Sequence, residues 1–374
     1  MMKIVIAPDS FKGSLSAQHA AESIKKGVKS ALDCETVLLP MADGGEGTAE
    51  VVAGVLAGSE VNLIVKGPLG EPTSATYYIA GDLAVMEMAV ASGITLVPRE
   101  KLNPLKASTY GTGQMIADAL SKGVRKIIIG IGGSATNDGG MGMAAALGVK
   151  FIDKDGKELI PCGENLEKIA EIDLSGINQK VKNVEIKVAC DVTNPLCGEN
   201  GASAVFGPQK GATPEMVKQL DAGLLNMAKK AKKVCGTDLT SIPGGGAAGG
   251  LGAGLVAFCG GVLEKGFDII SEAVKLEEKI KGADLVITGE GATDRQTAFG
   301  KLPAGVGGIA KKCGVPCVLI SGALVGDVHE LYDCGITAAF AAVTKVTDLD
   351  DVMKNAAENL ERAAENVARL FGGR

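Results

Sequence analysis

The stretch Arg125–Gly142, RKIIIGIGGSATNDGGMG, constrains the fold more than any other part of the chain. Its apolar run, Ile127–Ile129 with Ile131, is β-branched and uncharged, which is typical of a strand buried on both faces. Six glycines lie between residues 130 and 142, and glycine lets a backbone turn sharply and approach a ligand closely. The loop also offers hydroxyl, amide and carboxylate groups, on Ser134, Thr136, Asn137 and Asp138. The pattern predicts a buried strand followed by a loop that holds a polar ligand.

The composition indicates a folded protein with a large core. At 374 residues, 46% hydrophobic and 22% charged, the chain has the length of two domains or one large one. A net charge of -6 and an aromatic content of 3% exclude the basic, aromatic surface that nucleic-acid binding requires. The nine cysteines have no partner pair and no neighbouring histidines that would complete a zinc site, so we expect them to be reduced and structural.

Two segments bear on the location of the protein. The apolar run before Pro8 is too short for the core of a secretion signal. Residues 242–263 form the one long uncharged apolar stretch, but seven glycines between 244 and 254 favour a loop over a membrane span. We therefore expect a cytoplasmic protein that has no membrane contact.

The N-terminal region contains two successive strand, loop and helix patterns. The first strand covers residues 3–7 and the second covers 36–39; each is closed by a proline and followed by a polar loop and a helix. Open α/β sheets bind ligands at the carboxyl ends of their strands, which is where these loops lie. Ordinary loop polarity and the complement of a helix dipole are the alternatives. The polar residues of the two loops are Asp9, Ser10, Lys12, Asp43 and Glu46.

The middle of the chain has a different pattern. From Val61 the apolar segments are short and closely spaced, as in a β-meander. A later strand ends at Asp191, and Asn194 follows in the turn. Lys210 lies in a Gly-Pro-Gln-Lys-Gly loop before a helix that Thr213 would cap. The glycine-rich segment after that helix is also compatible with a flexible linker.

The C-terminal region returns to alternating strands and helices. A buried strand at 283–288 opens the segment GEGATDRQTAFGK, which contains Glu290, Asp294, Arg295 and Lys301. We therefore predict an α/β protein in which residues 1–66 and 281–374 form a parallel-sheet domain. Residues 67–280 would form an inserted α/β domain, with the active site in the cleft between the two.

Phosphoryl transfer is the chemistry that best fits this inventory. It requires amides and cations around phosphates, carboxylates for Mg²⁺ and an acid oriented at the attacking hydroxyl. The chain has no P-loop, and GIGGSA at 130–135 matches the dinucleotide fingerprint only weakly, since GAGLVA at 252–257 matches it too. With only two histidines, Ser-His or Cys-His nucleophilic catalysis has few candidates.

Six long motifs, in order along the chain, resemble those of the bacterial glycerate kinase family. They are APDSFKGSLSA (7–17), PMADGGEGT (40–48), GIGGSATNDGG (130–140), CDVTNPLCG (190–198), VFGPQKGA (205–212) and GEGATDRQT (289–297). The resemblance implies phosphorylation of D-glycerate by ATP and Mg²⁺, generally at the 2-hydroxyl. It also implies a flavodoxin-like (Rossmann-like) domain with a restriction-enzyme-like insert. A kinase that produces 3-phosphoglycerate, a nicotinamide-dependent hydroxy-acid oxidoreductase and a non-catalytic small-acid binding protein stay as alternatives, and a homo-oligomer stays open.

We assign hypothetical roles to the polar residues of these motifs. Asp191 would position or deprotonate the attacking hydroxyl, because a buried strand delivers its carboxylate into a loop, and Asp294 would join it in catalysis. Glu290 and Asp294, and then Asp43, would bind Mg²⁺. Lys12, Arg295 and Lys301 would bind phosphate or the glycerate carboxylate. The full set expected to bind the substrates or their phosphates is Asp9, Ser10, Lys12, Gly132, Gly133, Ser134, Thr136, Asn137, Asp138, Asn194, Lys210, Arg295 and Lys301. For each of these groups the alternative is a solvated or helix-capping role.

Overall fold

The computed structural model describes residues 1–345 and 348–372, which form two compact units. The first unit contains residues 1–43, 54–56 and the described part of 267–374, and the second contains 44–53 and 57–266. The first unit is therefore assembled from both ends of the chain and the second from its middle, and each has its own β-sheet. This confirms an α/β protein with a second sheet inserted into the sequence of the first.

The first unit is built on a five-stranded parallel sheet of order β13-β12-β11-β1-β2. Ile4 of β1 pairs with Leu285 on one side and Thr36 on the other, so the N-terminal strand lies inside the sheet. Central strands of a parallel sheet are covered on both faces, which explains why β1 is almost wholly apolar. The strands are β1 (Lys3–Ile6), β2 (Glu35–Leu38), β11 (Leu285–Thr293), β12 (Cys317–Leu324) and β13 (Ala338–Ala341).

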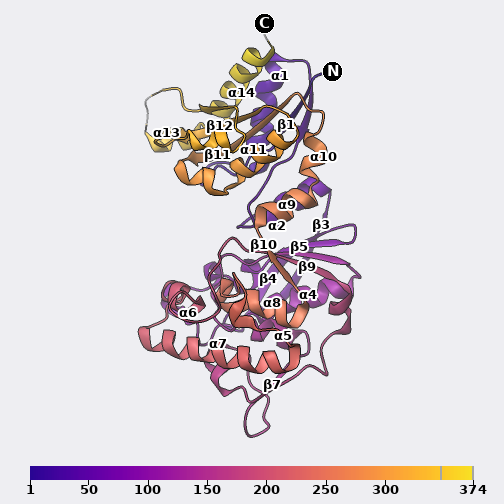
Figure 1. Ribbon diagram of the computed structural model, residues 1–374, viewed down its shortest axis with the longest axis vertical. Coiled ribbons are helices and arrows are strands. Elements are labelled where there is room, and N and C mark those ends of the chain that lie inside the picture. The colour runs from indigo at the N-terminus through magenta and orange to yellow at the C-terminus, as the bar shows by residue number, and fades with distance from the viewer. Residues whose placement is uncertain (346–347, 373–374) are drawn as a thin grey trace. The chain divides into compact units, whose positions relative to one another are not determined.

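Helices α1 and α14, which lie side by side (Figure 1), pack against this sheet through a shared apolar core. Ser16 caps α1 as predicted, its Oγ accepting a hydrogen bond from the His19 amide at 3.2 Å. Gly27 permits the close approach of the two helices, because a Cβ at this position would lie 2.0 Å from the Glu361 carbonyl oxygen. The helices of the unit are α1 (Ala17–Ala31), α9 (Gly266–Ala273), α10 (Leu276–Ile280), the 3₁₀ helix η8 (Arg295–Phe299), α11 (Leu302–Lys312), α12 (Glu330–Asp333), α13 (Leu349–Lys354) and α14 (Ala356–Gly372).

The second unit contains a six-stranded mixed sheet of order β10-β9-β6-β5-β4-β3. Strands β5, β6, β9 and β10 run parallel, whereas β3, β4 and β5 form an antiparallel meander. The strands are β3 (Ser59–Lys66), β4 (Pro72–Ala80), β5 (Leu83–Glu87), β6 (Lys126–Gly130), β9 (Glu185–Ala189) and β10 (Val262–Glu264), and a separate pair consists of β7 (Lys150–Ile152) and β8 (Glu171–Asp173). Because β5, β6, β9 and β10 are parallel, their carboxyl ends lie along the same edge of the sheet.

The boundaries of the two units differ from the expected ones at 66/67 and 280/281. The first crossing lies near residue 43, because β3 pairs along its whole length with β4 and so joins the second sheet. The return lies near residue 266, because the segment after it packs in the first unit, where Phe267 contacts Gly305 of α11. The proline and glycine cluster at 68–72 marks the turn between β3 and β4 and not a domain border.

The glycine-rich segment 242–263 lies in the interior of the second unit. Residues 244–250 are buried and 251–259 form helix α8, so neither the expected loop nor a flexible linker describes the whole segment. Gly254 allows α8 to reach the glycine loop, since a Cβ there would lie 2.5 Å from the Gly139 carbonyl oxygen. None of the helices within 1–345 and 348–372 is long and apolar enough to cross a membrane.

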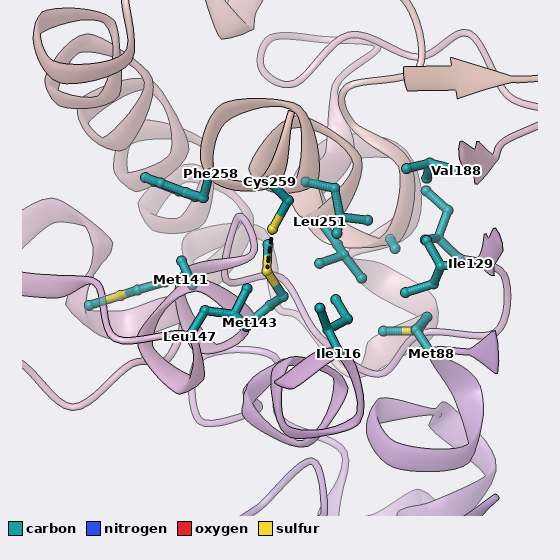
Figure 2. Packing of buried hydrophobic residues seen from close by; sticks show 14 of the residues in the cluster. Met88, Ile116, Ile129, Met141, Met143, Leu147, Val188, Leu251, Phe258 and Cys259 are labelled. Carbon is teal, nitrogen blue, oxygen red and sulfur yellow. Dashed lines mark hydrogen bonds between the residues drawn. The ribbon is translucent and has the colours of Figure 1, made fainter. Parts of the chain in front are cut away.

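Figure 2 shows how α5 and α8 pack together beside the sheet. The Cys259 Sγ lies 3.5 Å from the Met143 Sδ, as the dashed line in Figure 2 marks. Phe258 packs edge-on against Phe151 with ring centroids 5.8 Å apart. All nine cysteines are unpaired with one another, as predicted. The helices of the unit are α2 (Thr48–Leu56), α3 (Ala89–Ser92), α4 (Tyr110–Ser121), α5 (Met141–Ala146), α6 (Ala202–Phe206), α7 (Pro214–Cys235) and α8 (Leu251–Cys259), with 3₁₀ turns η1 (Ile94–Leu96), η2 (Arg99–Lys101), η3 (Gly163–Lys168), η4 (Gln179–Asn183), η5 (Pro208–Lys210), η6 (Leu239–Ser241) and η7 (Ala247–Gly250).

Candidate functional site

In the first unit, three acidic side chains gather where β1, β2 and β11 end. Asp9 follows β1, Asp43 follows β2 and Glu290 lies on the extended end of β11. The Asp9 amide donates to the Gly289 carbonyl oxygen at 2.8 Å, which holds the loop after β1 against β11. The carboxyl ends of neighbouring parallel strands meet at one edge of the sheet. Three acids that are far apart in the sequence therefore lie close together in the structure.

The surroundings of Asp9 and Glu290 disfavour negative charge on their carboxyl groups. Burial, with a smaller contribution from the negative charges of Asp43 and Glu290, raises the pKa of the half-buried Asp9 to about 7, against a backbone hydrogen bond from Ser10. Burial also raises the pKa of Glu290, although the hydroxyls of Thr297 and Thr293 each donate to its Oε1 at 2.8 Å. A cation at this edge would relieve the repulsion among the three carboxylates.

Metal-binding geometry is not preassembled at this edge. Within residues 1–345 and 348–372, no group of three or more histidine, cysteine, aspartate or glutamate side chains is spaced to hold a metal ion. Asp294, expected together with Glu290 as a metal ligand, lies at the start of η8, where its carboxylate and the Thr297 hydroxyl cap each other's backbone amides. Its Oδ1 also lies 3.3 Å from the Lys301 Nζ.

The expected cations of the first unit differ in their availability to a ligand. Lys12 and Ser10 are exposed in the loop after β1. Arg295 is exposed too, but its Nε and Nη2 atoms contact the Glu330 Oε1 at 2.9 and 2.7 Å. A ligand carboxylate would therefore have to compete with Glu330 for this guanidinium.

In the second unit, Asp191 emerges at the end of β9, as the sequence predicts. Its side chain is exposed, and its Oδ1 accepts a hydrogen bond from the Gly266 amide at 3.1 Å. The loop after β2 reaches the same edge, because a Cβ at Gly44 would lie 3.0 Å from the Ala189 Cβ and 3.8 Å from the Asp191 Oδ2. The Asn194 Nδ2 donates to the Asn200 carbonyl oxygen at 2.9 Å.

The tip of the glycine loop that follows β6 presents main-chain groups to solvent. Gly132 and Gly133 are exposed, and Gly133 has a φ of +71°, a conformation that glycine adopts at no steric cost. The amides of both residues donate to no acceptor in the part of the chain that the structure describes. Successive free amides beside a left-handed residue form a concavity that binds anionic oxygens.

The deeper part of the same loop is enclosed. Ser134, Thr136, Asn137 and Asp138 are at most 8% exposed. Asp138 accepts hydrogen bonds from the Thr109 amide and hydroxyl and from the Gly140 and Gly142 amides, at 2.7 to 3.1 Å. Burial raises the pKa of Asp138, and these four donors oppose the effect. In this structure Asp138 holds the loop against α4 and α5, and a direct contact with substrate stays a prediction.

Lys210, expected to contact phosphate, is also in the interior. It is 1% exposed and donates from Nζ to the Ser134 Oγ at 2.7 Å and to the Thr136 carbonyl oxygen at 2.6 Å. Burial lowers the pKa of its ammonium to about 7, and the charge of Asp138 acts in the opposite direction. The sequence did not reveal this placement, because a lysine in a glycine-rich loop is ordinarily solvated.

Glu87 is a further polar residue at the carboxyl edge of the second sheet, and the sequence did not point to it as a site residue. It ends β5, is 8% exposed and accepts hydrogen bonds from the Gly47 amide at 3.2 Å and the Ala49 amide at 2.8 Å. Burial raises its pKa, and both donors oppose the shift. A glutamate from another strand therefore anchors the start of α2, a role for which the sequence offered Asp43 and Glu46 only as alternatives. The available signal was an acid at the end of the apolar strand LAVME.

Comparison with known proteins agrees with this arrangement. The model of the glycerate kinase family matches residues 4–372. The chain is 48% identical to the glycerate kinase of Halalkalibacterium halodurans, over 98% of each chain. It is also 48% identical to the glycerate 2-kinase of Escherichia coli, over 98% of this chain and 97% of that one. A crystal structure of a candidate glycerate kinase 2 from Salmonella typhimurium LT2 superposes with a TM-score of 0.92 at 48% identity, covering 100% of this chain and 98% of that one. The chain therefore belongs to the glycerate kinase family and is, as a kinase, a phosphotransferase.

Proposed function

We propose that the chain transfers the γ-phosphoryl group of ATP to the 2-hydroxyl of D-glycerate and releases ADP and 2-phosphoglycerate. The observation that carries this proposal is the 48% identity, over 98% of the chain, to a relative that is a glycerate 2-kinase. The geometry supports the same class of reaction, because acids and free amides lie at the carboxyl ends of parallel strands. Phosphoryl transfer depends mainly on such positioning and on electrostatic stabilisation.

Asp191 is the proposed acid for the attacking hydroxyl. It is exposed at the end of β9, and the Gly266 amide holds one carboxylate oxygen at 3.1 Å. Asp191 is exposed whereas Asp138 is fully buried, so a ligand reaches the carboxylate of Asp191 more readily. Asp191 would accept the hydroxyl proton as the bond to phosphorus forms.

Mg²⁺ fits the carboxylates of the first unit by their chemistry. Oxygen ligands suit this ion. Burial is the main cause of the raised pKa of Asp9, and the charges of Asp43 and Glu290 add to it, which places both carboxylates near Asp9. Asp43 and Glu290 are the proposed ligands, and Asp294 would join them by giving up its contact with Lys301. When bound, the ion would neutralise charge on the phosphate oxygens.

The remaining polar groups are proposed to bind the substrates. The free amides of Gly132 and Gly133 suit a phosphate or carboxylate oxygen. Lys12 and Lys301 supply positive charge, and Arg295 would bind a carboxylate after leaving Glu330. Smaller positioning roles are proposed for Asp9, Ser10 and Asn194.

Several finer expectations accompany this proposal. We propose that the first unit is flavodoxin-like and the second restriction-enzyme-like in fold. That residues of both units act on the same substrates stays a prediction, as do a cytoplasmic location and the absence of nucleic-acid and membrane partners.

A ³¹P NMR spectrum of the full chain with D-glycerate, ATP and Mg²⁺ tests the activity and its regiochemistry together. A new phosphomonoester split into a doublet by one proton identifies 2-phosphoglycerate, whereas a triplet identifies attachment to the CH₂ carbon. A sample without glycerate is the control for ATP hydrolysis. An unchanged ATP spectrum would overturn the proposal.

A further inference from the structure

Lys210 is an unusual lysine because its ammonium group is buried without a carboxylate partner. It is 1% exposed, and no carboxylate oxygen among the described residues lies within 4.0 Å of its Nζ. Removing an unpaired charge from water carries a large free-energy penalty. Burial accordingly lowers the pKa of the group to about 7. A lysine that serves packing alone would be replaced by an apolar side chain of similar length without this penalty.

Both hydrogen bonds of the Lys210 side chain go to one short segment of the glycine loop. The Nζ donates to the Ser134 Oγ at 2.7 Å and to the Thr136 carbonyl oxygen at 2.6 Å. Ser134 directly follows the exposed tip formed by Gly132 and Gly133, whose amides are the proposed anion-binding donors. The ammonium group is therefore connected to the tip through a single residue.

The backbone that carries Lys210 is itself held firmly. Gly211, the next residue, has a φ of +89°, and a Cβ there would lie 2.5 Å from the Leu102 carbonyl oxygen. The Lys210 amide donates to the Gly207 carbonyl oxygen at 3.0 Å. A second link runs from the same region to the loop, since the Asn137 Nδ2 donates to the Ser203 Oγ at 3.0 Å. The η5 and α6 segments thus support the inner side of the loop.

The tip has few other restraints. On its outer side the Ile94 amide donates to the Gly133 carbonyl oxygen at 2.8 Å, and the Ala135 amide donates to the Ser92 carbonyl oxygen at 3.0 Å. Both contacts engage the chain on either side of Ser134, and neither reaches the Ser134 side chain. Glycine has the widest conformational freedom of any residue, so the shape of the tip depends on such supports.

We infer that Lys210 is a positioning residue for phosphoryl transfer, which acts through Ser134 and the Thr136 carbonyl to set the shape of the Gly132–Gly133 tip. The inference rests on the proposed function, and it replaces the expectation that Lys210 contacts phosphate directly. A buried group cannot follow a ligand, but it can preorganise the amides that bind one.

The test compares the full chain with Lys210→Met, Ser134→Ala and the double variant. Misplaced donors reduce the rate of the chemical step, so Lys210→Met should lower kcat about 10- to 100-fold and change KM less. Lys210 and Ser134 act through the same contact, so the kcat of the double variant should be no lower than that of Lys210→Met. Independent residues would instead lower kcat by the product of the two single-variant factors. Amide hydrogen exchange at 132–136 should become faster in Lys210→Met.

Lys230→Met is the matched control. Its Nζ donates to the Ala170 carbonyl oxygen at 2.8 Å, so this variant also removes a lysine bonded to a carbonyl in the same unit, but away from the glycine loop. It should keep the parent kcat and the parent exchange at 132–136. If Lys210→Met does not fold, Ser134→Ala alone tests the link through kcat and exchange.

Parent-like kcat and exchange in the folded Lys210→Met or Ser134→Ala variants would overturn the inference, as would losses that multiply in the double variant. A parent chain that phosphorylates no glycerate would instead refute the proposed function. The exchange comparison then still reports whether Lys210 shapes the tip, so the two failures are distinguishable.

Discussion

Lys210→Met should change the pH dependence of stability in a way that the structure specifies. In the folded chain burial holds the pKa of Lys210 at about 7, and its ordinary value is 10.5. Between these two pH values the unfolded chain binds a proton that the folded chain does not, so the free energy of unfolding of the parent rises with pH. Below pH 7 both states are protonated and the contribution is constant. Methionine has no proton to bind, so the variant lacks this rise.

The magnitude follows from the separation of the two pKa values. Each pH unit between them contributes about 1.4 kcal/mol, reduced near pH 7 because the folded group is still partly protonated there. From pH 7 to pH 9 the parent should therefore gain about 2 kcal/mol relative to Lys210→Met.

Urea unfolding followed by circular dichroism at pH 6, 7, 8 and 9 measures this difference. The chain has two compact units, which can unfold in two separate transitions. The transition to be analysed is the one whose urea midpoint the substitution shifts. Lys230→Met, which replaces a partly buried lysine of the same unit, is the control for the substitution itself. A constant difference between parent and Lys210→Met from pH 7 to pH 9 would show that Lys210 stays charged in the folded chain, and would refute the reasoning from burial.

Three further substitutions test separate parts of the argument. Asp191→Asn should lower kcat about 100-fold or more in an assay of ADP release, because the amide cannot accept the hydroxyl proton; an unchanged kcat would remove Asp191 from catalysis. Glu290→Gln should raise the Mg²⁺ concentration at half-maximal rate, since the ion loses a charged ligand, and an unaltered Mg²⁺ titration would exclude this residue as a ligand. Gly249→Ala should lower the free energy of unfolding in urea by about 1 to 3 kcal/mol or more, because left-handed strain is added to a clash. Gly249 has a φ of +67°, and its Cβ would lie 2.1 Å from the Thr136 carbonyl oxygen; parent-like stability would mean that the loop moves to accept the methyl group.

The spacing of apolar residues, together with the prolines and glycines that end helices and strands, predicted much of the local structure. Strand β6, the Ser16 cap of α1 and the Thr213 cap of α7 all depend on neighbouring residues, so a linear pattern was sufficient to find them. The domain boundaries were less accurate, because whether β3 pairs with the first or the second sheet depends on a partner strand and not on the composition of β3 itself. The helical part of the segment 242–263 was missed for a related reason. Gly250 and Gly254 of this segment pack so closely against Gly139 that a Cβ would not fit. A single sequence does not show which distant residue a glycine packs against.

The candidate site shows the same difference between what a linear pattern predicts and what the assembled fold decides. The sequence by itself determined which residue types stand at the ends of buried strands, and hence that acids such as Asp9 and Asp191 emerge at the carboxyl edges of parallel sheets. Only the tertiary structure decided the environment of each group: Asp138 and Lys210 look like solvated loop residues, yet both are enclosed. The same holds for Glu87, whose donors come from a different segment. Burial and hydrogen bonding between distant segments are properties of the assembled fold, and they determine whether a charged residue meets a ligand or supports the loop that does.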